Sequence, residues 1–218
     1  VLEDKEGFCK AFSDDYDLLK ITKALGKRYE IEDTYFKRHA SCGQAFGAID
    51  AMLNLRRELK VEHSEIKRIT INTFRAAAVL NQKKPDTVRR AKFSIPFLVA
   101  LALLKGRVGH FDFDTAVLHD PDIMALAAKV DVLEDEIINS RFPEKRTAAV
   151  IIELYDGTIV NQTVDIPRGM PENPLSPEEL IIKFKELSSI VVGIERSEWI
   201  AKCVLSEEPD ENIFSLMN

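Results

Sequence analysis

The stretch Ala148-Ala-Val-Ile-Ile-Glu-Leu154, Tyr155-Asp156-Gly157 and Thr158-Ile-Val-Asn-Gln-Thr-Val-Asp-Ile166 decides the fold. Its two outer runs are rich in β-branched residues, and an Asp-Gly pair between two such runs is a strong hairpin signature. We therefore expect one strand over Ala148–Leu154 that returns as a second strand over Thr158–Ile166.

The elements around this hairpin are mixed. Alternating apolar residues predict a half-buried strand over 66–73, and residues 130–133 favour a second, brief strand. An extended stretch is expected between Tyr29 and Phe36, and Pro96 should kink or restart the helix in which it lies. Helices are expected over residues 14–26, 44–59, 87–105 and 120–128, just before Leu118, from 176 to about 189, and around 199–205. A helix between strands, and a hairpin before a final helix, indicate an α+β two-layer sandwich.

This sandwich is expected to occupy residues 35–190. The two ends, 1–34 and 191–218, are typical of helical pieces that need something else to pack on. The sequence begins at Val1 without Met and without the basic and apolar segments of a secretory signal. This start resembles the middle of a domain, which favours a truncated chain.

Composition excludes several classes of protein. Of the 218 residues, 45% are hydrophobic and 30% are charged, which is an ordinary balance for a globular domain and not for a disordered chain or a disulfide scaffold. The longest apolar run, Ser94–Leu104, is too short to cross a membrane. A net charge of -6 argues against a nucleic-acid binder. Three widely spaced cysteines form no disulfide or metal pattern, so we expect a reducing cytoplasm.

The segment Lys37-Arg38-His39-Ala-Ser-Cys42 is the first candidate site. The sequence has no glycine-rich phosphate loop, no nucleophile elbow and no zinc spacing. Here three basic groups precede a helix, whose first N–H groups favour a carboxylate. An extended backbone would place Lys37 and His39 on one face and Arg38 on the other. Such a cluster could bind an anionic substrate or remove a proton, and the alternative is a solvated basic turn.

Other candidates have equally simple alternatives. Lys92 and Ser94 could reach a cleft, or they could belong to a charged collar before an apolar helix. Cys42 is a nucleophile only if a base adjoins it, and otherwise it is an inert buried thiol. Arg168 could contact an anion or a neighbouring subunit, or it could be a turn residue. The dispersed histidines are solvated or core residues: His63, His110 and His119.

Three motifs, in order along the chain and with the hairpin between the second and third, resemble the MmgE/PrpD family. They are Tyr35-Phe-Lys37 through Ile49-Asp50-Ala51, then Ala91-Lys-Phe-Ser94-Ile-Pro-Phe97 with Gly106-Arg-Val108, then Pro167-Arg-Gly169-Met-Pro171-Glu-Asn-Pro174-Leu-Ser176. The resemblance extends from Gly7 to about Ser189 and corresponds to the later half of a typical member. It implies a large all-helical domain, largely absent from this chain, beside a smaller α+β domain. It also implies a homodimer and no metal or organic cofactor.

The resemblance also implies roles for individual residues. Lys37 matches the lysine that begins the family's Lys-x-Tyr-Pro-x-Cys pattern and lies in the cleft between the domains. Cys42 stands where some members of the family, such as cis-aconitate decarboxylase, have a histidine, and Phe97 stands where that decarboxylase has an active-site tyrosine. The sequence departs from the pattern at His39-Ala40, where Tyr-Pro is usual, and at Phe46, where many relatives have histidine. The predicted catalytic residues are Lys37, His39 and Cys42, with Arg38, Lys92, Ser94 and Phe97 binding substrate and no metal ligand.

The implied chemistry removes a proton next to a carboxylate of a small di- or tricarboxylate, most simply as in a 2-methylcitrate dehydratase-like lyase. The charge left behind needs a positive, water-poor site. A lysine, with its ordinary pKa of about 10.4, is a poor base unless burial or a neighbouring cation such as His39 or Arg38 lowers that pKa. Otherwise Lys37 is an electrostatic anchor. The alternative hypothesis is a non-catalytic remnant or a subunit that needs a partner chain to supply the missing helical domain.

Overall fold

The hairpin lies at one side of a mixed sheet. In the computed structural model, which describes residues 1, 2, 4–58 and 62–205, four described strands have the order β2-β1-β3-β4. The strands are β1 (Ile66–Thr73), β2 (Val130–Glu134), β3 (Ala148–Leu154) and β4 (Ile159–Val164). β3 pairs antiparallel with both β1 and β4, whereas β2 runs parallel to β1. The predicted hairpin and the two further strands are confirmed.

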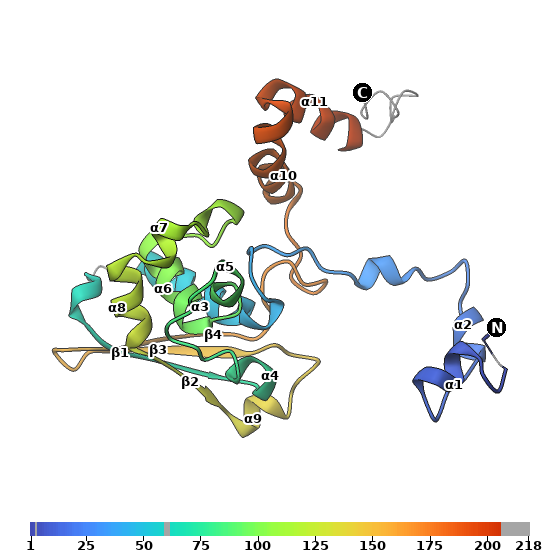
Figure 1. The fold of residues 1–218 in the computed structure, drawn as a ribbon, viewed down its shortest axis with the longest axis horizontal. Helices are drawn as coiled ribbons and strands as arrows, with labels where there is room; N and C mark the ends of the chain where they lie inside the picture. The colour runs from blue at the N-terminus through green and yellow to red at the C-terminus, as the bar shows by residue number, and fades with distance from the viewer. Residues whose placement is uncertain (3, 59–61, 206–218) are drawn as a thin grey trace. The chain divides into compact units, whose positions relative to one another are not determined.

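Helices cover one face of this sheet, as the edge-on sheet in Figure 1 shows. The longer ones over the sheet are α3 (Phe46–Glu58), α6 (Ile95–Lys105) and α8 (Pro121–Ala128). Shorter turns of helix are α4 (Arg75–Ala78), α5 (Val88–Ala91), α7 (Thr115–Leu118), α9 (Glu136–Asn139), η2 (Gly43–Ala45), η3 (His63–Glu65) and η4 (His110–Asp112). The fold is α+β, as the order of elements predicts.

The core lies between α3, α6, α8 and the inner face of the sheet. Residues of β3 alternate between buried and half-buried, so one face of the strand packs and the other does not. α6 is buried along Ile95–Ala102, in agreement with its almost wholly apolar sequence. The buried core includes Phe46, Ile49, Met52, Phe74, Phe97, Leu98, Leu101, Ile69, Ile71, Val150 and Ile152.

The single helix expected over 87–105 is wrong, because the chain forms two helices there. α5 ends at Ala91, and α6 begins after Ser94, whose hydroxyl accepts a hydrogen bond from the Phe97 N–H at 3.1 Å. Pro96 therefore restarts the helix, in a first-turn position where its missing N–H costs no hydrogen bond. α6 ends at Gly106, whose φ of 72° is the left-handed conformation that glycine adopts readily.

Residues 1–34 form a unit of their own, separate from the unit that begins at Tyr35. It contains α1 (Phe8–Phe12), α2 (Leu19–Thr22) and the 3-10 turn η1 (Glu30–Asp33). Two sequence predictions fail here. The helix expected over 14–26 is one short turn, and the stretch expected to be extended after Tyr29 contains η1. None of the described hydrophobic side chains of this unit is buried, so no packing extends its helices.

The end of the described chain is a pair of helices, α10 (Pro177–Val192) and α11 (Ile194–Leu205), which contact each other. α10 begins with a capping box, in which Ser176 and Glu179 bond reciprocally to each other's backbone N–H. α10 has no buried residue, and its exposed apolar side chains include Ile182, Ile190 and Val191. Among the described helices none is long and apolar enough to span a bilayer.

Candidate functional site

The segment that carries Lys37 is tied to the domain at both ends. The Phe36 N–H donates to the carbonyl of Gly169, and the Ala40 N–H donates to the carbonyl of Val108, each at 3.0 Å. Gly169 has a φ of 99°, and a Cβ added there would lie 2.2 Å from the Phe36 carbonyl oxygen. Only glycine satisfies both conditions, so Gly169 permits the close approach of the two backbones.

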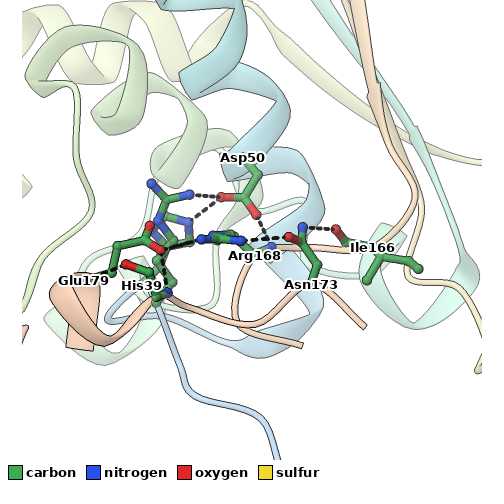
Figure 2. Close-up of polar contacts among 8 residues, drawn as sticks. His39, Asp50, Ile166, Arg168, Asn173 and Glu179 are labelled. Atoms are coloured by element: carbon green, nitrogen blue, oxygen red, sulfur yellow. Dashed lines mark hydrogen bonds and ion pairs between the residues drawn. The ribbon is translucent and has the colours of Figure 1, made fainter. Parts of the chain in front are cut away.

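Asp50, a buried residue of α3, accepts hydrogen bonds or ion pairs from three donors (Figure 2). Its Oδ1 lies 2.9 Å from Nε2 of His39 and 3.3 Å from Nη1 of Arg38. Its Oδ2 accepts the backbone N–H of Arg168 at 2.7 Å. A carboxylate with only 5% of its surface exposed therefore joins the segment, the helix and the 166–176 loop.

The loop itself is braced by a second set of polar contacts, visible around Arg168 in Figure 2. The Arg168 guanidinium donates to Glu179 Oε2 at 2.5 Å and to Asn173 Oδ1 at 3.0 Å. The Asn173 side chain in turn donates to the Ile166 carbonyl at 3.0 Å. From the sequence, Arg168 could contact an anion or a neighbouring subunit, or be a turn residue. In the structure it has a structural role, because its side chain links the loop to the start of α10.

Burial controls the charge of His39. Desolvation lowers the pKa of its imidazole, and the hydrogen bond to Asp50 opposes this shift without overcoming it. The neutral ring then donates from Nε2–H to the Asp50 carboxylate. By contrast, Arg168 lowers the pKa of Glu179 and keeps that carboxylate ionised. His39 is therefore a neutral, buried donor and not a cation beside Lys37.

The prediction that Lys37 and His39 share a face is wrong. His39 is buried and Lys37 is exposed, while Arg38 turns toward the same carboxylate as His39. The chain bends at residues 39–41, immediately after this pair of basic residues. In the described part of the chain no ion pair holds the Lys37 ammonium, so it is available to solvent.

Three other predicted site residues, Cys42, Lys92 and Phe97, are linked to one another by a series of contacts. The Cys42 N–H donates to the Lys92 carbonyl at 2.9 Å, and the Lys92 ammonium lies 5.0 Å from the ring centroid of Phe113. The Phe113 ring is 6.4 Å from that of Phe97. The structure thus connects Cys42, Lys92 and Phe97 through contacts, and it places Arg38 and His39 with Asp50 instead.

Ser94 and Phe97, which we expected to bind substrate, are fully buried. Ser94 caps α6 and also donates its hydroxyl to the Gln82 carbonyl. Phe97 packs in the core. Both side chains therefore have structural contacts that account for their presence.

Two cavities adjoin Arg38. One, of about 210 Å³, lies against α10 and is lined by Lys183, His110 and several apolar side chains among others. The other, of about 300 Å³, is lined by Arg57, Arg168 and Asn173 among others. Neither includes Lys37 or Cys42. Among the described residues no group of three His, Cys, Asp or Glu side chains is placed to hold a metal ion.

Sequence reasoning missed Asp50 as a site residue. A signal was present, because Asp50 follows Ile49 and precedes Ala51 and Met52 on the apolar face of the predicted helix over 44–59. A carboxylate in such a position is rarely buried unless it is paired.

The family model of the MmgE/PrpD C-terminal domain matches residues 39–207 of this chain. A cis-aconitate decarboxylase-like protein of Aspergillus oryzae is 25% identical over 210 residues, which are 91% of this chain and 42% of that protein. A cis-aconitate decarboxylase of Aspergillus terreus is 24% identical over 92% of this chain and 44% of its own length. The 2-methylcitrate dehydratase of Escherichia coli is 29% identical over 126 residues, which are 54% of this chain and 26% of that enzyme. The chain thus spans less than half the length of these relatives, and it belongs to the MmgE/PrpD family through the C-terminal domain.

Proposed function

We propose that this chain is the C-terminal part of an enzyme that removes a proton next to a carboxylate of a small di- or tricarboxylate. The reaction that we favour is that of a 2-methylcitrate dehydratase-like lyase. One observation carries the proposal: the family domain covers most of the chain, and the relatives that match it bear the names of a dehydratase and of decarboxylases. Each of these reactions can start from a carbanion beside a carboxylate, which a positive site stabilises.

Lys37 is the residue to which we assign the substrate carboxylate. Its ammonium is exposed, while the backbone on either side is fixed by the bonds of Phe36 and Ala40. A fixed backbone reduces the number of positions that a charged side chain explores before it meets its ligand. We assign Lys37 the role of an electrostatic anchor and not of a buried base, because its side chain is exposed.

We assign the other predicted catalytic residues different tasks. His39 acts by holding the segment on Asp50 and not by touching substrate. Cys42 is half-buried, and its N–H donates to the Lys92 carbonyl, so the two residues are neighbours. The Lys92 ammonium adds a second positive charge, which lies over the Phe113 ring.

The rest of the proposed active site would come from the helical domain, from a longer form of this chain or from a partner chain. Two observations support this. The chain spans 42% of the A. oryzae relative, and exposed apolar side chains are concentrated in residues 1–34 and in α10. Monomeric proteins rarely leave large apolar patches uncovered. We further propose a homodimer that works in the cytoplasm.

The experiment measures turnover of 2-methylcitrate and of cis-aconitate by the 218-residue chain and by the native protein, each with and without Lys37→Ala. We expect Lys37→Ala to abolish turnover and to leave the far-UV circular dichroism unchanged. Lys84→Ala is the matched control, because Lys84 is an exposed lysine in a turn. Near-normal turnover by Lys37→Ala would contradict the assignment.

The second candidate is a non-catalytic subunit, and the burial of Ser94 and Phe97 favours it. Intact mass of the native protein separates the two. A mass well above 24.7 kDa means that the helical domain accompanies this one on the same chain. A mass near 24.7 kDa, together with no turnover by the chain alone, supports a subunit that depends on a partner.

A further inference from the structure

Arg146 is a half-buried cation for which the described residues supply no acidic partner. Its Nε atom is buried and has no hydrogen-bond acceptor. Leaving a buried polar group unpaired costs free energy, and buried charges are normally paired. An acceptor from outside these residues would remove that cost.

The backbone at Arg146 is held firmly in place. Its N–H donates to the Asp165 carbonyl at 3.1 Å, beside the end of β4. On the other side its carbonyl oxygen approaches Gly47 so closely that a Cβ there would lie 2.8 Å from it. Gly47 is in the first turn of α3. The backbone of Arg146 is therefore held against that turn, which fixes the position from which its side chain extends.

A second donor converges on the same place. The Arg146 guanidinium carbon lies 5.7 Å from the ring centroid of Tyr35. A Cβ added at Gly43 would lie 3.0 Å from the Tyr35 hydroxyl and 3.8 Å from Arg146 Nη1. Because Gly43 has no side chain, the Tyr35 hydroxyl and a guanidinium N–H of Arg146 both lie close to its Cα.

The turn that contains Gly43 has further unpaired groups. Ser41 is only 8% exposed, and its hydroxyl has no partner among the described residues. The side-chain oxygen of Gln44 is also buried and without a donor, and only the opposite orientation of this amide turns its NH2 group toward an anion. Three of the four buried side-chain atoms of the described chain that lack partners thus belong to Arg146 or to this turn. The fourth is on Glu186, at a different place in the fold.

We propose that Arg146, Tyr35 and the Ser41–Gln44 turn bind one carboxylate group of a small di- or tricarboxylate. The planar guanidinium matches a carboxylate, and the hydroxyls of Tyr35 and Ser41 supply further donors. The chemical class of the ligand rests on the proposed function. The subsite itself rests on the unpaired buried groups and on the approach of Arg146 and Tyr35 to Gly43.

The test is a calorimetric titration of the 218-residue chain with citrate, which needs no turnover. Arg146→Gln is expected to weaken citrate binding about tenfold or more, because it removes a charge-assisted hydrogen bond at a half-buried position. Tyr35→Phe should weaken it less, since only the hydroxyl is lost. Gly43→Ala should also weaken it, because the added methyl group lies close to both donors. The control, Arg89→Gln, changes an exposed arginine elsewhere and should bind as the wild type does.

Equal citrate affinity in the wild type and Arg146→Gln would overturn the proposal, as would no binding by the wild type at about 10 mM citrate. Inorganic phosphate that binds more tightly than citrate would overturn the carboxylate assignment. If Arg146→Gln fails to fold, Tyr35→Phe and Gly43→Ala decide, because both leave the guanidinium in place. Arginine-dependent citrate binding without turnover in the assay above would refute the proposed function and leave the subsite standing.

Discussion

Replacement of Asp50 by alanine tests the central role given to this carboxylate. The change removes the acceptor of two short hydrogen bonds, one from the half-buried Arg168 N–H and one from the buried His39 Nε2. Hydrogen bonds to charged groups contribute about 1.5–3 kcal/mol each. The longer contact with Arg38, whose side chain is 30% exposed, adds about 0.5 kcal/mol. We therefore expect Asp50→Ala to lower the free energy of unfolding by about 4 kcal/mol.

Urea denaturation followed by far-UV circular dichroism measures this loss. If the dependence of the unfolding free energy on urea concentration stays the same, the substitution has changed stability. For a chain of this size the same loss lowers the Tm by about 8–16 °C. Asp86→Ala is the control, because its carboxylate forms an exposed ion pair with Arg90 and should cost less than about 0.5 kcal/mol. A loss below about 1 kcal/mol for Asp50→Ala would refute the reasoning, since the buried donors would then have found other acceptors.

The remaining predictions concern pH, one glycine and one cap. Burial lowers the pKa of His39 below its ordinary value of 6.5. As the pH falls below 6.5, the unfolded chain therefore binds a proton at this histidine that the folded chain does not bind. The contribution of His39 to the free energy of unfolding is thus complete above pH 6.5 and is lost as the pH falls toward the lowered pKa of the folded state. His39→Gln should flatten this decline, as measured by urea denaturation at several pH values. Gly169→Ala should cost about 2 kcal/mol or more, through its φ of 99° and the clash with Phe36, and hydrogen exchange should show the Phe36 amide unprotected. Ser94→Ala should lower stability by about 1–2 kcal/mol through loss of the α6 cap. Lost turnover at unchanged stability would instead return Ser94 to the substrate site.

The sequence predicts those elements whose local pattern and tertiary surroundings agree. The hairpin follows from Asp156-Gly157, and α3 and β1 follow from their periodicities, because each buries the face that its pattern makes apolar. The helix expected over 14–26 fails for the opposite reason. Its composition favours a helix, but none of its described side chains is buried, and short helices without packing are marginal in water.

The candidate site is harder to predict, because long-range contacts build it. The basic segment 37–39 is visible in the sequence, but the shared contact of Arg38 and His39 with Asp50 in α3 is a property of the fold. The burial of Asp50 among apolar residues hints at a partner, but the spacing along the chain does not say which residues provide it. The same holds for Arg146, which no motif marks and which only the fold places beside Gly43 and Tyr35.

The hydrogen bond between Asp50 and Arg168 joins residues that are 118 positions apart in the sequence. This separation affects the order in which parts of the domain become structured during translation. α3 emerges from the ribosome long before the 166–176 loop, so it first exists without one of the donors to Asp50 and without the Gly169 carbonyl that holds Phe36. Closing so long a loop costs entropy that is offset only once the sheet between the two segments has formed. The backbone that carries Lys37 is therefore among the last parts of the domain to become fixed. A nascent chain that ends before residue 166 carries Lys37 on a segment with one end untied.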